Sequence, residues 1–280
     1  MDSNPPARLG QTATFARRLT QTDFDRFAAL SGDDNPIHVD PAFAARSRFG
    51  RPVAHGMLLY SVLCGAVSRF LPGALQIEQT LKFPTPTYAD EPLTVRLAVT
   101  GAAAGQLELA TLIFHTHGDL ACEGTARVWA PGVQPLEAAP AGPPTAPESA
   151  AAYKHLALGQ TVALSRRYTD ADLAAYAALA GDPGPLFAPA PGALPGPLLG
   201  SLWSTLLGTR LPGRGTNWLK LRLRFPAPAG AAATLTARVT ITRLRPEKDL
   251  VDLRAECLTP AGQTAAEGEV LVLAKDLEPL

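Results

Sequence analysis

The segment Gly56–Leu71 reads GMLLYSVLCGAVSRFL and carries the longest apolar run of the chain, Met57–Val67. The segment is too long for an ordinary strand, and the Pro-Gly pair that follows it predicts that a helix ends there. Because the segment has no broad polar face, we expect this helix to be buried on most sides. A membrane span needs about 20 apolar residues, so the segment predicts a core helix and not a transmembrane one.

Strand-like segments lie on both sides of this helix. Thr12–Leu19 alternates polar and apolar residues as a strand does, and a short helix is expected after it, with Thr20 or Thr22 as its N-cap. Further strands are predicted after the core helix, at Gln76–Phe83, Leu93–Thr100, Leu107–Thr116 and Leu120–Trp129. A buried helix followed by successive antiparallel strands predicts an α+β hotdog fold, in which a curved sheet wraps the helix, although another α+β sandwich would fit the same pattern.

The same order of predicted elements occurs twice in the chain. Leu9–Thr12 (LGQT) returns as Leu158–Thr161, and Phe27–Asp33 (FAALSGD) returns as Tyr176–Asp182 (YAALAGD). A two-copy repeat of this length predicts two tandem units that pack as an internal pseudo-dimer, hence a double hotdog. The units are predicted at residues 1–132 and 152–280, and the Ala/Pro-rich residues 133–151 between them are predicted to be a linker.

Composition argues against several classes of partner. The 25 basic and 25 acidic residues give no net charge, so we expect no nucleic-acid partner. The three cysteines, Cys64, Cys122 and Cys257, lie far apart and are expected to be free buried thiols in a reducing compartment. The sequence shows no signal-peptide pattern and no apolar segment of membrane length, so it predicts a cytoplasmic protein with no membrane partner.

Two motifs precede and overlap the start of the core helix. Residues 31–38 read SGDDNPIH, and residues 49–58 read FGRPVAHGML. In order and separation they resemble the two signatures of the MaoC-like dehydratase family, which includes (R)-specific enoyl-CoA hydratases, and the resemblance extends over about Gln11–Trp129. It implies a hydro-lyase that hydrates 2-trans-enoyl thioesters, or in reverse dehydrates 3-hydroxyacyl thioesters. The substrate would be carried on coenzyme A or acyl carrier protein, with no other cofactor.

The motif residues suit this chemistry on their own. Hydration needs a water that is deprotonated as it attacks C3, and a donor for the charge that develops on the thioester carbonyl oxygen. Asp33 and His38 lie on a loop stiffened by Pro36, so they can converge on one water, and histidine exchanges protons near neutral pH. A free backbone N–H near Gly56, at the positive end of the core helix, is the predicted oxyanion donor, and the missing side chain allows close approach. His55, just before it, is predicted to orient the helix start.

The resemblance assigns a role to each motif position. It implies that Asp33 and His38 are the catalytic pair, that Asn35 supports the loop or the water, and that Gly56 binds the carbonyl. Ser61, just over one turn along the helix, is predicted to contact the catalytic loop. Nowhere in the sequence do His, Cys and carboxylates show metal-ligand spacing, so no metal is predicted.

The second copy lacks the complete motif. His38 is replaced there by Phe187, whereas Asp33 is retained as Asp182, and the segment before the second core helix is nine residues shorter than in the first copy. Without the proton carrier we predict one active site per chain, in the first half, with Phe187 and Trp203 filling the other site as core. The second half is expected to cover the sheet edge and helix face of the first, and its shortened segment could open a tunnel for an acyl chain.

Two other functions would use the same scaffold. A hotdog thioesterase would direct a carboxylate-activated water at the carbonyl carbon and would not need the Asn-Pro-x-His element. A non-catalytic acyl-thioester-binding subunit is the other alternative, since the second half already tolerates the loss of the motif. The alternating Lys220, Arg222 and Arg224 form a basic strand face that could meet carrier phosphates or could simply be solvated. The chain is expected to act as its internal pseudo-dimer, and a homodimer of such chains is a further possibility.

Overall fold

The computed structural model describes residues 8–133, 152–182 and 187–278. The first half contains β1 (Thr12–Arg18), α1 (Gln21–Ser31), α2 (Pro36–Val39), α3 (Pro41–Arg46), α4 (Gly56–Phe70), β2 (Leu75–Lys82), β3 (Pro92–Ala103), β4 (Gln106–His115) and β5 (Leu120–Trp129). The second half contains β6 (Ala152–Tyr153), β7 (Leu156–Ala157), β8 (Thr161–Arg167), α5 (Asp170–Ala180), α6 (Gly196–Thr209), β9 (Asn217–Arg224), β10 (Thr234–Arg245), the 3-10 turn η1 (Pro246–Lys248), β11 (Leu250–Leu258) and β12 (Thr264–Leu273).

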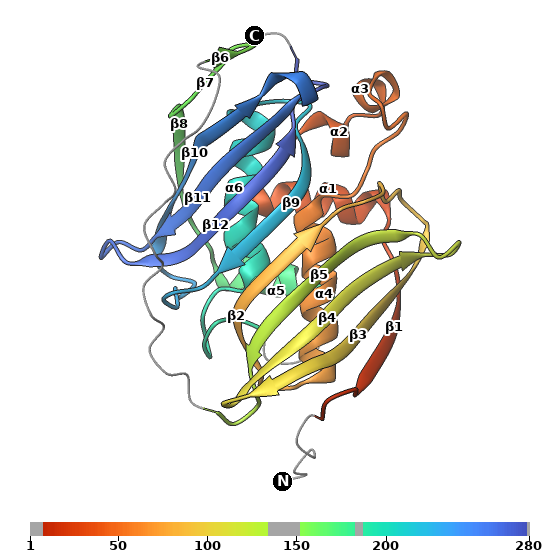
Figure 1. Cartoon of the computed structure of the whole chain (residues 1–280), viewed down its shortest axis with the longest axis vertical. Helices are drawn as coiled ribbons and strands as arrows, with labels where there is room; N and C mark the ends of the chain where they lie inside the picture. Colours follow the sequence, from red (N-terminus) through yellow and green to blue (C-terminus); the bar gives the residue numbers. More distant parts are fainter. Residues whose placement is uncertain (1–7, 134–151, 183–186, 279–280) are drawn as a thin grey trace.

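The main sheet is continuous through both halves, and this confirms the double hotdog fold. Its ten strands run in the order β1-β3-β4-β5-β2-β9-β12-β11-β10-β8, and neighbouring strands are antiparallel. The long helices α4 and α6 lie side by side against one face of this sheet, one helix for each half (Figure 1). β2 and β9 join the halves over the register from Glu78↔Arg224 to Lys82↔Lys220. Each half on its own would expose an unpaired edge strand here, which the pairing removes.

The same local signals begin and end the first long helix of each half. Thr20 caps α1 through a capping box with Asp23, and Gly32 ends the helix in the left-handed conformation at φ 82°. Thr169 and Asp172 form the same capping box on α5. The repeat in the sequence is therefore a repeat in structure over α1 and α5.

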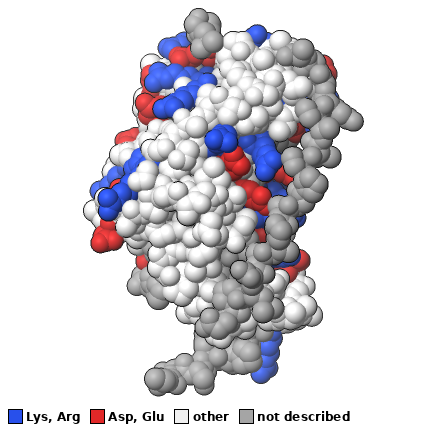
Figure 2. Space-filling model, turned by 90° about the vertical axis from the view of Figure 1, so that its left-hand side faces the viewer, with Lys and Arg blue, Asp and Glu red and all other residues white. Residues whose placement is uncertain are grey.

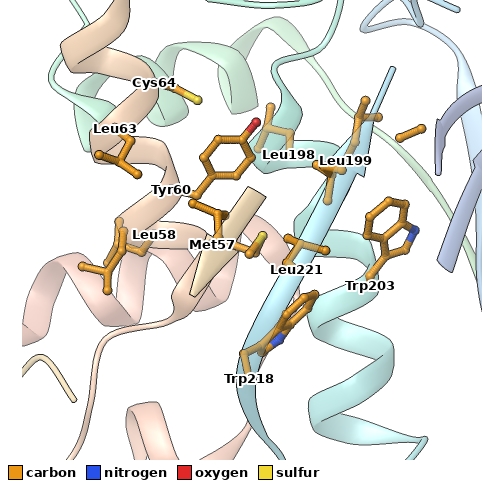
Figure 3. Packing of buried hydrophobic residues seen from close by; sticks show 14 of the residues in the cluster. Met57, Leu58, Tyr60, Leu63, Cys64, Leu198, Leu199, Trp203, Trp218 and Leu221 are labelled. Atoms are coloured by element: carbon orange, nitrogen blue, oxygen red, sulfur yellow. The ribbon is translucent and has the colours of Figure 1, made fainter. Parts of the chain in front are cut away.

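One hydrophobic core runs through both halves. In Figure 3 the ring of Tyr60 of α4 points toward Leu198 of α6, and the sulfur of Met57 points toward Leu221 of β9. Burial of a large apolar side chain stabilises a fold by about 1.5 to 3 kcal/mol, so each half depends on the other to cover its helix. Cys64, Cys122 and Cys257 are buried and free, as predicted.

Two features differ from the sequence prediction. Residues expected to form an open loop are two short helices, α2 and α3, each of which starts at a proline, where the missing N–H costs nothing. A small second sheet, β6 with β7, was not predicted. Residues 187–195 of the second half hold no counterpart of α2 and α3, in keeping with their shorter sequence. The predicted division of the chain stays a prediction, since residues 134–151 of the expected linker lie outside the described residues.

Within the described residues, no helix combines the length and the apolar character that crossing a membrane would require.

The close approach of α4 to the end of α5 gives a test of this packing. A Cβ on Gly65 would lie 2.1 Å from the carbonyl oxygen of Ala180, so Gly65→Ala must push the two helices apart. We expect it to lower the free energy of unfolding by about 1 to 3 kcal/mol or more in urea titrations. Gly230→Ala is the matched control, because its Cβ would meet nothing within 4 Å. Equal stability of the two variants would contradict the packing described.

Candidate active site

Asp33 lies in the loop that follows α1, and its carboxylate is buried. Its Oδ2 accepts a hydrogen bond from the hydroxyl of Ser204, and its Oδ1 accepts a 3.3 Å hydrogen bond from the backbone N–H of Asn35. Ser204 belongs to α6, so this bond crosses from one half to the other. A Cβ on Gly208, one turn further along α6, would lie 2.7 Å from Asp33 Oδ1. The helix of the second half therefore provides both a donor and the space for this carboxylate.

His38 lies in α2 and is buried beside Asp33. Its Nδ1 is 2.7 Å from the carbonyl oxygen of Val53, which can only accept, so Nδ1 carries the proton and Nε2 keeps its lone pair. Burial lowers the pKa of His38 below its ordinary value, although Asp33 and the Val53 carbonyl act in the opposite direction. A neutral imidazole with a fixed tautomer is the form that can accept a proton from water.

His55 stacks on His38, with ring centroids 3.8 Å apart and an interplanar angle of 27°. Its Nε2 is 3.0 Å from the backbone carbonyl oxygen of Asp33, so it holds the loop that carries the carboxylate. Burial, and then the neighbouring His38, lower the pKa of His55 well below its ordinary value. Its Nδ1 is buried and has no hydrogen-bond partner among the described residues. This position at the start of α4 suits the orienting role predicted for His55.

Asp33, His38 and His55 each offer a ligand atom, and these atoms lie within 4.8 Å of one another. One water with hydrogen bonds of about 2.8 Å can reach two atoms at such a separation. The same donor set could also bind a divalent cation. The absence of a metal therefore stays a prediction from the sequence.

Gly56 begins α4, and its N–H is at the positive end of the helix. Among the described residues no protein group accepts a hydrogen bond from this N–H. The ring of Phe83 lies directly over it, and a Cβ at position 56 would come within 2.9 Å of that ring. A side chain at position 56 would have to displace the Phe83 ring, so glycine suits this close approach.

Gly56 and His38 line the same small cavity, which is partly open to solvent. Its apolar wall is built from Ile37 of α2, Leu59 of α4 and Trp218 of β9. The cavity therefore brings a potential proton acceptor and a free helix N–H to one space of mixed polarity, with one wall from the second half.

Asn35 bonds to the second half, whereas Ser61 bonds within its own helix. The amide of Asn35 spans to the second half, where Nδ2 donates to the Thr216 carbonyl (2.9 Å) and Oδ1 accepts from the Gly215 N–H (3.1 Å). Of the two roles predicted for it, this geometry suits support of the loop. The hydroxyl of Ser61 donates to the Met57 carbonyl of its own helix at 2.8 Å, and Ser61 does not line the cavity.

Comparison with known proteins identifies the family. A family model described as "MaoC like domain" matches residues 6–113. The chain is 39% identical over 127 residues to the (R)-specific enoyl-CoA hydratase of Aeromonas caviae, an alignment that covers 44% of this chain and 95% of that protein. The chain belongs to the MaoC-like family. The curated relatives carry the names of hydratases and dehydratases, so this is a family of hydro-lyases.

Solved structures share the fold over both halves. A structure named "MaoC-like dehydratase" has a TM-score of 0.74 and 17% sequence identity, and the match covers 95% of this chain and 98% of that one. A Mycobacterium tuberculosis protein described as having a double hotdog fold has a TM-score of 0.70 and 14% identity, over 95% of this chain and 96% of that one. At these identities the likeness shows the fold alone.

The second half of this MaoC-like chain repeats the framework of the site but closes it. Ser68 of α4 donates to Asp182 Oδ1 at 2.9 Å, which mirrors the contact of Ser204 with Asp33. The N–H of Gly196, the counterpart of Gly56, donates to the side-chain carbonyl of Gln76 at 2.8 Å. The helix N–H that faces a cavity in the first half is therefore bound by protein in the second.

Other core side chains complete this closure. A Cβ on Gly196 would meet the Phe225 ring at 2.5 Å, as one on Gly56 would meet the Phe83 ring, but it would also meet the Tyr60 hydroxyl at 2.7 Å, which has no equivalent at Gly56. Phe187 and Trp203 are buried in the core, as predicted, but the groups nearest Gly196 are Phe225, Tyr60 and Gln76.

The sequence did not predict that Ser204 and the loop before β9 contact the Asp33 loop. The repeat gave no signal for Ser204, because it aligns with Cys64 of α4, whereas Ser68, which bonds Asp182, aligns with Gly208. In a pseudo-dimer the loop of each half packs against the helix of the other, so the partners of the Asp33 loop lie in the second copy.

The basic strand face is partly neutralised by the protein. Arg222 and Arg127 both bond the carboxylate of Glu78, and Arg224 Nε lies 3.6 Å from it. These ion pairs favour a solvated strand face over a phosphate site. On the face seen in Figure 2, acidic and basic side chains lie side by side without a large patch of one sign.

The buried histidines predict how stability depends on pH. Since the pKa values of His38 and His55 are lowered by folding, the unfolded chain binds more protons below about pH 6.5, and the free energy of unfolding falls as pH decreases from there. Each histidine contributes a slope of up to about 1.4 kcal/mol per pH unit.

We expect His55→Gln, which retains a donor for the Asp33 carbonyl, to reduce this slope by about half, measured by urea unfolding between pH 5 and 7. His117→Gln, at an exposed position, is the control and should leave the slope unchanged. An identical slope in all three proteins would show that the buried pair does not set the acid stability.

Proposed function

We propose that the first half of the chain catalyses (R)-specific hydration of 2-trans-enoyl thioesters, and in reverse the dehydration of 3-hydroxyacyl thioesters. The observation that carries this proposal is that the side chains of Asp33 and His38 lie close together and that His38 shares a cavity with the free N–H of Gly56. The identity to an (R)-specific enoyl-CoA hydratase supports the reaction class and its stereochemistry.

The residues present can carry each step of the addition. The thioester carbonyl oxygen accepts from the Gly56 N–H, and the acyl C3 lies near the water held by Asp33 and His38. As the water oxygen bonds to C3, His38 Nε2 takes one of its protons, and the electron pair of the C2–C3 double bond moves toward the carbonyl oxygen. The positive end of α4 stabilises that charge. Return of the proton to C2 completes the addition of water and leaves His38 neutral.

Asp33 and the groups around it hold the geometry of this step. The Ser204 hydroxyl and the Asn35 N–H fix the carboxylate, while Val53 fixes the imidazole tautomer. A carboxylate held this way can accept a hydrogen bond from the attacking water and take part in the transfer of its proton. The reaction involves no net oxidation or reduction, so it needs no redox cofactor. The acyl group is carried on coenzyme A or acyl carrier protein. Exposed Arg48 at the cavity rim is a cation that carrier phosphates could meet.

Substitution of the two acid–base residues tests the proposal directly. We expect Asp33→Asn and His38→Gln each to lower kcat for crotonyl-CoA hydration by about 10²- to 10⁴-fold, because each removes proton transfer to and from the water. Asp182→Asn is the matched control: it should keep the activity, although it weakens the buried contact with Ser68 and should cost about 1 to 3 kcal/mol of stability.

Two signals recorded together separate the alternatives. Loss of the enoyl chromophore without release of free thiol indicates hydration, and release of thiol indicates a thioesterase. If crotonyl-CoA binds and neither signal changes, the acyl-binding role is favoured and the proposal fails. Circular dichroism of each variant shows that a loss of activity is not a loss of fold.

The protonation of His38 predicts an acid limit to the reaction. Because burial lowers the pKa of His38, kcat/KM for hydration should fall on acidification only below pH 6.5, where the imidazole becomes protonated and cannot accept a proton. In NMR titrations His38 should titrate below 6.5, and still lower in Asp33→Asn, since the Asp33 charge raises its pKa. Titration of His38 above pH 6.5 would contradict this picture of the site.

A further inference from the structure

Thr87 carries a buried hydroxyl that the described protein leaves without a partner. The residue is 2% exposed, and its Oγ1 has no hydrogen-bond partner among the described residues. It lies between β2 and β3 and lines the cavity that also contains His38 and Gly56. A buried hydroxyl without a partner costs free energy, because its lost hydration is not replaced. A group that pairs with it can reach it only through this cavity.

The other two threonines on the cavity are satisfied by the protein. The hydroxyl of Thr85 donates to the Leu120 carbonyl at 2.7 Å, and that of Thr216 donates to the Gly213 carbonyl at 2.6 Å. A valine at position 87 would fill the same space without an unpaired polar atom. The hydroxyl of Thr87 is therefore not explained by packing, and an unpaired polar atom on a cavity points to a ligand.

The backbone contacts of Thr87 place it near the groups of the proposed reaction. The N–H of Ala54 donates to the Thr87 carbonyl at 2.8 Å. Next to Ala54, the carbonyl of Val53 accepts from His38 Nδ1 at 2.7 Å. Gly56 follows Ala54 by two residues, which along an extended chain corresponds to about 7 Å. This span is comparable with a thioester group and the first bonds of its carrier arm.

The chemistry of the substrate limits which of its atoms can pair with this hydroxyl. In a 2-enoyl thioester the acyl carbons offer neither a donor nor an acceptor. The thioester oxygen and the first amide of the carrier arm do, and we call this part of the substrate the thioester head. A hydroxyl that faced only acyl carbons would lose its hydration without compensation. The thioester head is therefore the part that suits Thr87.

We propose that Thr87 is a substrate-binding residue whose hydroxyl forms a hydrogen bond with the thioester head. This inference rests on the proposed hydratase function, and it adds a residue of the site and the part of the substrate that this residue recognises. It also gives a reason for the unpaired hydroxyl: the atom lowers the stability of the free protein and gains its partner when the substrate binds.

The test compares kcat/KM for crotonyl-CoA and for the crotonyl thioester of N-acetylcysteamine, which keeps the thioester head and lacks the rest of the carrier. Loss of one neutral hydrogen bond in Thr87→Val should lower kcat/KM by about 2- to 10-fold, and equally for both substrates. Thr87→Ser keeps the hydroxyl and should retain the activity of the unaltered protein.

Stability separates binding of the substrate from a role in the fold. Thr87→Val removes an unpaired polar atom, so the midpoint of its urea unfolding should stay the same or rise while its activity falls. Thr111→Val is the matched control, because Thr111 is also buried but accepts a 3.0 Å hydrogen bond from Gln79 Nε2 and does not line the cavity. It should lower the midpoint and leave kcat/KM unchanged.

Calorimetric titration with butyryl-CoA, which has the thioester head but cannot be hydrated, distinguishes this inference from the function on which it rests. If the unaltered protein binds butyryl-CoA and does not hydrate crotonyl-CoA, the hydratase function fails, and weaker binding by Thr87→Val still supports the inference. Unchanged kcat/KM together with unchanged affinity in Thr87→Val would overturn the inference and leave the hydratase function standing. A loss confined to crotonyl-CoA would overturn it too, since the contact would then lie further along the carrier. Neither binding nor hydration by the unaltered protein would overturn both.

Discussion

The hydrogen bond from Ser204 to the carboxylate of Asp33 is the contact on which the site depends. A buried carboxylate is costly unless hydrogen bonds replace its hydration, and here one donor comes from its own loop and one from the helix of the other half. Asn35 makes the same crossing to Gly215 and Thr216. The Asp33 loop is therefore held only when both halves are folded and packed.

This constraint gives a physical reason for the second half to persist after losing its own motif. The pairing of β2 with β9 removes an exposed edge from each half, and α4 and α6 cover one another's apolar faces. The two sites have then diverged around the same frame. At Gly56 the helix N–H opens on a cavity, whereas at Gly196 it is bound by Gln76.

The stacked histidines connect activity with stability. In the proposed reaction His38 is the base, and burial lowers its pKa, which keeps the imidazole neutral over a wider pH range at the cost of acid stability. His55 also lowers the stability at acid pH, because it is buried against His38 and bonded to the loop. The two rings form one unit in which the inner ring supports the backbone of Asp33 and the outer ring faces the cavity.

The sequence by itself determined the fold, the duplication and the residues of the catalytic loop. Gly56–Phe70 has no polar face and could only be a core helix, the strand periodicity followed it, and the spacing of Asp33 and His38 survives in the structure as a close pair. These features are local, since they depend on periodicity, caps and short motifs that neighbouring residues decide.

Only the tertiary structure decided which distant groups complete the site. Ser204, Thr216 and Trp218 are separated from Asp33 by more than half the chain, and no local pattern marks them. The conversion of the expected loop into α2 and α3, and the capture of the Gly196 amide by Gln76, were decided in the same way. A polar atom that is buried away from water needs a hydrogen-bond partner, and the partner can come from any segment that the fold packs beside it. Contacts between distant segments therefore decide these partners.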